Sequence, residues 1–134
     1  MRDFGKKDHL DWSHLERIRS RWRGNLVVKG IMHADDAVHA ADVGADGIIL
    51  SNHGGRQLDG TASPLQVLPD IAGRIDGRIP VMIDGGFRRG TDIVKALALG
   101  ASFVFVGRPF LYAAAIGGMA GVLKATEILK TEVN

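Results

Sequence analysis

The segment Ser51-Asn52-His53-Gly54-Gly55-Arg56-Gln57 carries the residue types best suited to chemistry. It places a histidine and an arginine three positions apart, directly after the apolar run Gly47-Ile48-Ile49-Leu50. An imidazole exchanges protons near neutral pH, and a guanidinium binds a carboxylate through two parallel hydrogen bonds. The two glycines allow a sharp turn that holds both groups over one small volume. The pattern indicates proton transfer next to a carboxylate, as in a 2-hydroxy acid; the alternative is a solvated glycine-rich loop.

Two later loops have the composition of phosphate-binding loops. The first is Asp84-Gly85-Gly86-Phe87-Arg88-Arg89-Gly90, and the second is Gly107-Arg108-Pro109-Phe110. Glycines let a phosphate approach backbone N–H groups closely, and the start of a following helix adds a favourable dipole. Arginines at both places supply charge-assisted hydrogen bonds. Each loop alone is a weak signal, but the pair after consecutive strands predicts a phosphate site. Neither loop has a Walker motif or the spaced glycines of a Rossmann turn.

Lys29 lies at the end of the apolar run that begins at Leu26. It shares a strand face with Val27 and is expected to point inward, where an unpaired ammonium is costly. Two interpretations stay open. Lys29 either forms a structural salt bridge or stabilises negative charge that develops on a bound cofactor.

Four short apolar runs must position these residues. They lack polar alternation, so they predict parallel strands buried on both faces, over residues 26–29, 47–50, 80–83 and 103–106. Helical spacing of apolar residues fills the intervals, over residues 35–43, 64–75 and 90–99, with further helices at 12–22 and about 112–130. Asp35 and Thr91 fit helix caps or first turns, Pro64 fits a first turn, and Gly44 and Gly100 fit helix ends.

The repeating unit is therefore a strand, a loop and a helix, which indicates an α/β fold with a parallel sheet and right-handed crossovers. All candidate residues follow the ends of strands. A (β/α)8 barrel has its active face there, and an open doubly wound sheet also binds ligands there. Position alone leaves both architectures open.

The composition of the 134 residues is that of one soluble globular domain, with 46% hydrophobic and 24% charged residues. The net charge of +2 is too small and too dispersed to indicate nucleic acid, and the basic cluster at 17–23 fits the solvated face of a helix. The absence of cysteine excludes disulfides and thiol chemistry. No apolar run is long enough to span a membrane, and the start Met1-Arg2-Asp3 is no secretory signal, so we expect a cytoplasmic protein.

Other polar residues are not assigned to the site. His9, His14, His33 and His39 fall in helical or loop segments and are expected to be solvated. Asp59 follows the His-Gly-Gly-Arg motif and fits either a contact with Arg56 or a turn cap.

The motifs together resemble the FMN-dependent 2-hydroxy-acid dehydrogenase and oxidase family, which includes L-lactate dehydrogenase, mandelate dehydrogenase and glycolate oxidase. The heptapeptide that starts at Ser51 is similar to the active-site signature of that family. Val28-Lys29-Gly30 and the loops at 84–88 and 107–108 stand in the expected order beside it. The resemblance covers the chain from about Asp11. It implies the C-terminal half of a (β/α)8 barrel, with about four β/α units in one partial domain over residues 1–134.

The resemblance also implies FMN as the cofactor and oxidation of a lactate-, mandelate- or glycolate-type 2-hydroxy acid to the 2-oxo acid. By that resemblance His53 is the base and contacts the substrate, and Arg56 binds the substrate carboxylate. Lys29 lies near N1 of the flavin, and Ser51 contacts the flavin. The FMN phosphate lies on Asp84, Gly85, Gly86, Phe87, Arg88, Gly107 and Arg108.

Members of the family are considerably longer, and the resemblance covers only their C-terminal part. It implies that strands covering the flavin, substrate-binding tyrosines and an aspartate that orients the base histidine lie outside this sequence. We expect a missing N-terminal half-barrel or self-association to complete the ring, and hence a homo-oligomer. The alternative is a catalytically inactive half-barrel that only associates or weakly binds FMN.

Overall fold

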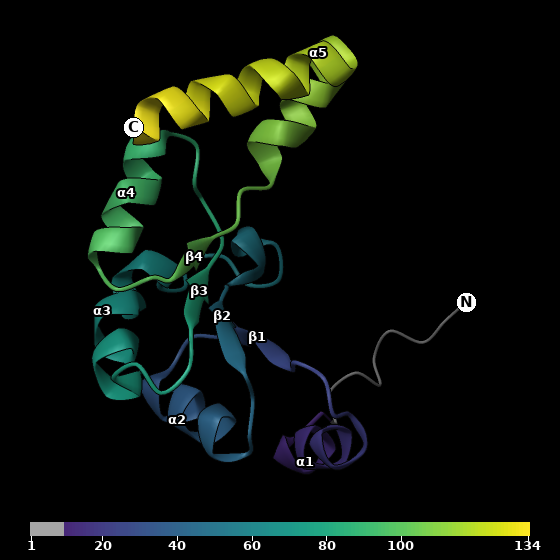
Figure 1. Ribbon diagram of the computed structural model, residues 1–134, viewed down its shortest axis with the longest axis vertical. Helices are drawn as coiled ribbons and strands as arrows, with labels where there is room; N and C mark the ends of the chain where they lie inside the picture. Colours follow the sequence, from purple (N-terminus) through teal and green to yellow (C-terminus); the bar gives the residue numbers. More distant parts are fainter. Residues whose placement is uncertain (1–9) are drawn as a thin grey trace.

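The computed structural model describes residues 10–134, in which strands and helices alternate (Figure 1). The predicted contributions of His9 and of the polar start lie outside the described residues. The elements, in chain order, are α1 (Trp12–Arg21), β1 (Val27–Ile31), α2 (Ala34–Asp42), β2 (Gly47–Leu50), the short 3-10 helix η2 (His53–Gly55), α3 (Pro64–Ile75), β3 (Val81–Ile83), α4 (Gly90–Ala98), β4 (Phe103–Val104) and α5 (Arg108–Val133).

The strands form one four-stranded parallel sheet in the order β1-β2-β3-β4. Ile48 lies opposite Val81 in the register, and Met82 lies opposite Phe103. Parallel neighbours require a crossover connection, and α2, α3 and α4 supply it. Figure 1 shows these three helices on the same side of the sheet. A doubly wound sheet has helices on both faces, whereas a barrel has them only outside, so this arrangement is that of a partial barrel.

The core lies between the sheet and this helical layer. From the strands it receives Ile48, Leu50 and Ile83, and from α3 it receives Leu68 and Ile71, all fully buried. Small residues of α2 and α4, among them fully buried alanines, let these helices approach the strands closely. This packing fixes where each strand ends, and therefore where the loops carrying the predicted site residues begin.

The other face of the sheet is open, which corrects the expectation of strands buried on both faces. Val27, Phe103 and Phe105 are exposed, and the rings of Phe103 and Phe105 lie 4.9 Å apart. All crossovers run on the helical side, so nothing within residues 10–134 covers these side chains. In a closed barrel this face is the interior, filled by side chains from strands across the ring.

Several boundaries differ from the predicted ones. Strand β1 continues to Ile31, with a register shift after Lys29, and β4 is only two residues long. The Phe105 N–H still donates to the Ile83 carbonyl at 2.8 Å, so pairing extends one residue beyond β4. Helix α5 begins at Arg108 rather than near 112, because Pro109 suits its first turn.

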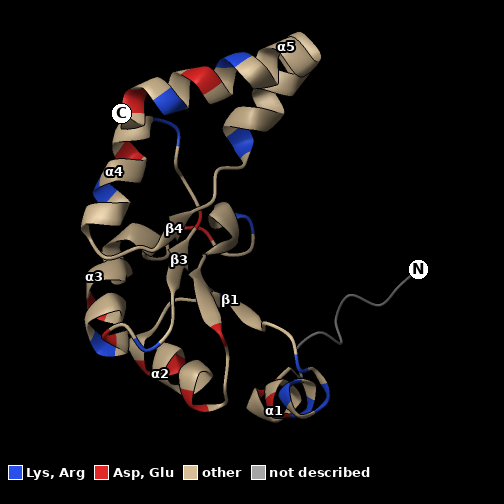
Figure 2. Ribbon diagram, in the orientation of Figure 1, with Lys and Arg blue, Asp and Glu red and all other residues tan. Residues whose placement is uncertain are grey.

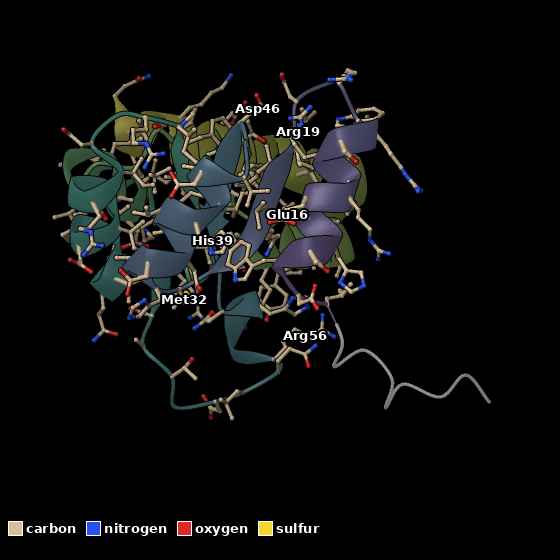
Figure 3. All side chains as sticks on the ribbon, turned by 90° about the horizontal axis from the view of Figure 1, so that it is seen from below. Glu16, Arg19, Met32, His39, Asp46 and Arg56 are labelled. Carbon is tan, nitrogen blue, oxygen red and sulfur yellow. The ribbon has the colours of Figure 1, made fainter. Side chains whose placement is uncertain are left out.

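Helix α1 is tied to the body of the fold by polar and aromatic contacts. Arg19 of the basic cluster forms an ion pair of 2.9 Å with Asp46, and Figure 3 shows the two side by side. His39 stacks on Trp12 with 4.2 Å between ring centroids and is exposed, as expected. His14 and His33 make local capping hydrogen bonds at the starts of α1 and α2. No helix within residues 10–134 is long and apolar enough to cross a membrane.

Candidate active site

A cleft of about 290 Å³ lies at the carboxyl ends of the strands. Every predicted site residue except Ser51 lines it: Lys29, His53, Arg56, Asp84, Gly85, Gly86, Phe87, Arg88, Gly107 and Arg108. Lys29 belongs to strand β1, and the other residues belong to the segments that follow β2, β3 and β4, far apart in the sequence. The parallel sheet is what gathers them at one edge.

Lys29, Ser51 and Asp84 form a hydrogen-bonded group beside this cleft, which Lys29 and Asp84 line. The Lys29 ammonium donates to the Ser51 hydroxyl at 2.6 Å and lies 2.7 Å from a carboxylate oxygen of Asp84. Ser51 is buried, whereas Lys29 is exposed toward the open face of the sheet. The structure therefore contains the salt bridge that the first interpretation of Lys29 predicts. The same contacts aim the ammonium at the cleft, which keeps the cofactor interpretation open.

The other Asp84 oxygen is unusual. Among residues 10–134, Oδ1 of Asp84 is the one buried side-chain polar atom without a hydrogen-bond partner. A buried acceptor without a donor is unfavourable by about 1–3 kcal/mol, so such an atom marks a place where a ligand donor fits. A carboxylate repels phosphate, and this oxygen is instead suited to accepting from a hydroxyl group.

His53 stands on a left-handed turn. Its φ is 59°, and Gly54 and Gly55 follow with φ of 67° and 74°, a conformation that glycine adopts freely and histidine seldom does. Two side chains hold this turn. The Ser51 hydroxyl accepts from the His53 N–H at 3.1 Å, and the Asn52 amide oxygen accepts from the Gly54 N–H at 3.1 Å. The result presents the imidazole at the mouth of the cleft.

Asn52 is a residue that the sequence interpretation missed. The available signal is its position directly before a glycine pair, since asparagine side chains bond the backbone two residues on in such turns. Arg56 follows the turn, is exposed and lines the same cleft as His53. Asp59 accepts from the Gly60 N–H at 2.9 Å, so of its two expected roles the turn cap is the one observed.

The two glycine-arginine loops, which we call the cradle, present N–H and guanidinium donors to the cleft. Gly85 and Gly86 have φ of 95° and 84°, and an added Cβ at Gly86 would meet no atom within 4 Å. Within residues 10–134, the backbone N–H groups of Gly85, Gly86 and Gly107 donate no hydrogen bond. These donors lie beside the guanidinium groups of Arg88 and Arg108 in one cleft, which is the chemistry a phosphate requires.

The start of α4 is not part of that cradle, contrary to the sequence expectation. Asp92 accepts from the N–H groups of Arg88 and Arg89 at 3.1 and 3.0 Å. Glu132, from the end of α5, accepts from the Gly90 N–H at 2.6 Å and from Nε of Arg89 at 2.7 Å. The carboxylates of this chain thus occupy the donors of the first turn, and the start of α5 is the helix end left facing the cleft.

These contacts perturb the acids of the α4 start. The N–H groups of Arg88 and Arg89 hold the pKa of Asp92 below its ordinary value. The Arg89 guanidinium, followed by the Gly90 N–H, lowers the pKa of Glu132, and Glu132 in turn raises the pKa of Arg89. Both carboxylates are therefore ionised at neutral pH. The positive charge of Arg89 is paired with Glu132, whereas Arg88 lines the cleft.

Arg108 connects the cradle to the His53 turn. Its guanidinium donates to the Gly54 carbonyl at 3.3 Å. Phe87 also lines the cleft and is buried in the core. Phe105, which the sequence interpretation did not single out, adds an apolar wall at the open side.

A larger groove of about 650 Å³ lies between α1 and α2 and includes none of the predicted residues. Glu16, Arg19 and His39 line it (Figure 3). Two of its carboxylates, Asp35 and Asp42, are already paired with arginines of α3 and of the loop after it. The convergent groups and unpaired donors lie instead in the strand-end cleft.

The fold is that of a partial (β/α)8 barrel, and the cleft lies at the carboxyl ends of its strands, with a glycine-arginine loop after each of the last two. The sequence profile of the family described as FMN-dependent dehydrogenase matches residues 2–134. The chain belongs to the FMN-dependent dehydrogenase family. The resemblance identified in the sequence and the expected cofactor class are thereby confirmed at the level of the family.

Individual relatives agree. An L-lactate oxidase of Nostoc sp. is 50% identical over 125 residues, which are 93% of this chain and 34% of that protein. An L-lactate dehydrogenase of Caulobacter sp. is 48% identical over 124 residues, 92% of this chain and 33% of that protein. A crystal structure of mandelate oxidase with benzoyl-formic acid superposes with a TM-score of 0.88 at 45% identity, over 92% of this chain and 37% of that one. The chain spans about a third of the length of the curated relatives it matches.

Proposed function

We propose that this chain provides the cofactor-phosphate site, the base and the carboxylate clamp of an FMN-dependent enzyme that oxidises a 2-hydroxy acid to the 2-oxo acid. The observation that carries the proposal is the single strand-end cleft. It unites an imidazole, a guanidinium, an ammonium and a cradle of unpaired N–H groups, drawn from strand β1 and from the three segments that follow β2, β3 and β4.

The cradle fits the phosphate end of FMN. The amides of Gly85, Gly86 and Gly107 and the side chains of Arg88 and Arg108 would bind the phosphate. The unpartnered oxygen of Asp84 would accept from a hydroxyl of the chain that joins phosphate to flavin. Lys29, held by Ser51 and Asp84, would lie beside the ring and stabilise negative charge there. When bound, FMN supplies the acceptor of two electrons.

His53 and Arg56 would act on the substrate. Arg56 would bind the carboxylate of the 2-hydroxy acid with its planar fork, which fixes the orientation of C2. The imidazole of His53 would then take one of the two protons that leave when C2 and its hydroxyl become a carbonyl. Both side chains are exposed within residues 10–134, so further chain must cover them before water is excluded.

We infer that the open face and the two free edges of the sheet accept the rest of the ring. The outer edges of β1 and β4 have no neighbouring strand within residues 10–134, and the exposed Phe103 lies beside one of them. A separately supplied N-terminal half-barrel or a second copy of the chain would cover them, and the second arrangement is a homo-oligomer.

Complementation tests the proposal. The chain is co-expressed with the N-terminal two-thirds of a relative such as the Nostoc L-lactate oxidase, and the complex is purified and mixed anaerobically with L-lactate, glycolate or mandelate. We expect a yellow complex whose flavin is bleached by one of these acids, and loss of bleaching with retained colour in His53→Ala. A yellow complex that no 2-hydroxy acid bleaches would support the alternative, an inactive half-barrel that only binds FMN.

A further inference from the structure

The two arginines of the cradle differ in their contacts. Figure 2 shows the basic segments from which they come, at the start of α5 and in the loop before α4. The guanidinium of Arg108 donates to the Gly54 carbonyl at 3.3 Å, whereas the Arg88 side chain lines the cleft without a hydrogen-bond partner within residues 10–134. Arg108 is therefore the cradle arginine that is attached to the turn carrying His53.

The Gly54 carbonyl is the point at which Arg108 meets this turn. No backbone N–H within residues 10–134 donates to that carbonyl, so Arg108 is its partner there. An added Cβ at Gly54 would lie 3.1 Å from Nη2 of Arg108, which places the guanidinium directly against the turn. The segments in contact follow β2 and β4, which β3 separates in the sheet. One side chain thus connects the segment of His53 with the second loop of the cradle.

A guanidinium can bind this carbonyl and a phosphate at the same time. It has several N–H donors in a planar fork, and the Gly54 carbonyl accepts from one side of it. The other donors are left for an anion in the cleft, to which charge-assisted hydrogen bonds are strong. The turn needs such a restraint, because His53 has φ 59°, a conformation that histidine seldom adopts.

We propose that Arg108 is a positioning residue that couples phosphate in the cradle to the geometry of the His53 turn. The inference rests on the proposed function, since it takes the cradle as the phosphate site and His53 as the base. Bound phosphate fixes the guanidinium of Arg108, and the guanidinium fixes the Gly54 carbonyl, so the imidazole is held most firmly when the cradle is occupied. Such coupling is reciprocal, and the turn must in return affect the affinity for phosphate.

Amide chemical shifts of the isotope-labelled chain test the coupling, with inorganic phosphate as the probe at constant ionic strength. In the parent chain we expect phosphate to shift the N–H signals of the cradle glycines and, with the same midpoint, those of His53 and Gly54. Arg108→Met keeps an unbranched side chain but removes its donors. We expect this variant to bind phosphate more weakly and, extrapolated to saturation, to show no shift at His53 and Gly54. In the control, Arg88→Met, binding is weakened too, but the turn still shifts at saturation.

The glycine pair of the turn supplies the reciprocal test. Gly54 and Gly55 have φ of 67° and 74°, so alanine is strained at either position. Only a Cβ at residue 54 would meet Arg108, because the nearest atom to a Cβ at residue 55 is Oδ1 of Asp59, at 3.9 Å. We expect Gly54→Ala to weaken phosphate binding by about fivefold or more, and Gly55→Ala to bind within about twofold of the parent chain.

Shifts of the cradle glycines without shifts of the turn in the parent chain would overturn the coupling and leave the proposed phosphate site intact. Shifts at His53 and Gly54 that persist in Arg108→Met at saturation would overturn it as well, because phosphate would then act on the turn by another route. An equal loss of affinity in Gly54→Ala and Gly55→Ala would assign the effect to backbone strain and also overturn it. A parent chain whose cradle glycines do not respond to phosphate would overturn the proposed function together with this inference.

Discussion

Hydrogen bonds to Ser51 and Asn52, which do not line the cleft, hold the residues that do. Ser51 accepts from both the Lys29 ammonium and the His53 N–H, so one buried hydroxyl sets the place of two predicted functional groups. Asn52 closes the turn on the other side. Replacing Ser51 or Asn52 is expected to displace the functional groups. Replacing His53 or Arg56 is expected to remove the functional groups themselves.

Arg56→Lys tests the carboxylate clamp at this scale. In the complemented enzyme we expect KM to rise and kcat/KM to fall by about 2 kcal/mol or more, because a point charge cannot make the paired hydrogen bonds of a guanidinium. Steady-state kinetics on the 2-hydroxy acid measure the effect, with Arg74→Lys on α3 as the control. Unchanged kinetics in Arg56→Lys would remove the carboxylate role.

Among the elements, the end of α5 contacts the start of α4. Glu132 binds both the Arg89 side chain and the N–H of Gly90, so the end of α5 holds the start of the helix that follows the first glycine-arginine loop. An added Cβ at Gly90 would lie 2.4 Å from the Glu132 Cβ and 2.7 Å from its carbonyl carbon. The two helices can approach this closely only because residue 90 is glycine.

Gly90→Ala is therefore expected to lower the free energy of unfolding by about 1–3 kcal/mol, because α5 must shift. Gly73→Ala is the matched control, since it lies within α3 and its new methyl would meet nothing within 4 Å. We expect it to be stabilising by about 0.4–1 kcal/mol. Chemical denaturation of both variants measures the two effects, and equal midpoints would contradict the close contact.

Low pH is expected to weaken the contact between Glu132 and the start of α4. The folded protein holds the pKa of Glu132 below its ordinary value of 4.5, so the stabilisation is complete above that value and is lost as the pH falls through the lowered one. Thermal melting from pH 7 to pH 2 measures it. Glu132→Gln should be less stable at pH 7 and should lose less of its stability in acid than the parent. Parallel curves would show that Glu132 contributes nothing there.

For the whole molecule, the dominant feature is a sheet with helices on one face only. The exposed apolar side chains of the other face, together with the unpaired edges of β1 and β4, favour association with further strands. We accordingly expect the 134-residue chain to self-associate and to show no turnover of a 2-hydroxy acid when alone.

Phe103→Gln tests this expectation, because Phe103 lies on the open face next to the free edge of β4. Sedimentation velocity should show less association than in the parent chain. Leu97→Gln, a comparably exposed position on α4, should associate like the parent. Equal association of both variants would place the contact elsewhere.

The sequence predicted the strand–loop–helix order, because short apolar runs and helical spacing are local signals. It also predicted which residues gather at one edge, because parallel strands share that edge. It did not predict that Asp84 pairs with Lys29 or that Glu132 occupies the start of α4. Those contacts join residues 55 and 42 positions apart, and only tertiary packing brings them together. The break in α5 was missed as well, although the glycine pair at 117–118 signals it.

The central claim is that the strand-end cleft binds the phosphate of FMN, and amide chemical shifts of the isotope-labelled chain test it most directly. FMN, riboflavin and inorganic phosphate are titrated separately, with Arg88→Ala as the cradle variant and Arg74→Ala as its control. We expect FMN and phosphate to shift the amides of Gly85, Gly86 and Gly107, with a Kd near millimolar, or about −4 kcal/mol.

Riboflavin, which lacks the phosphate, should leave the chemical shifts of those amides unchanged. Arg88→Ala should weaken the response of these shifts to FMN, and Arg74→Ala should not. The account would be contradicted if riboflavin shifted the three glycines as FMN does. Shifts confined to the groove between α1 and α2 would contradict it as well.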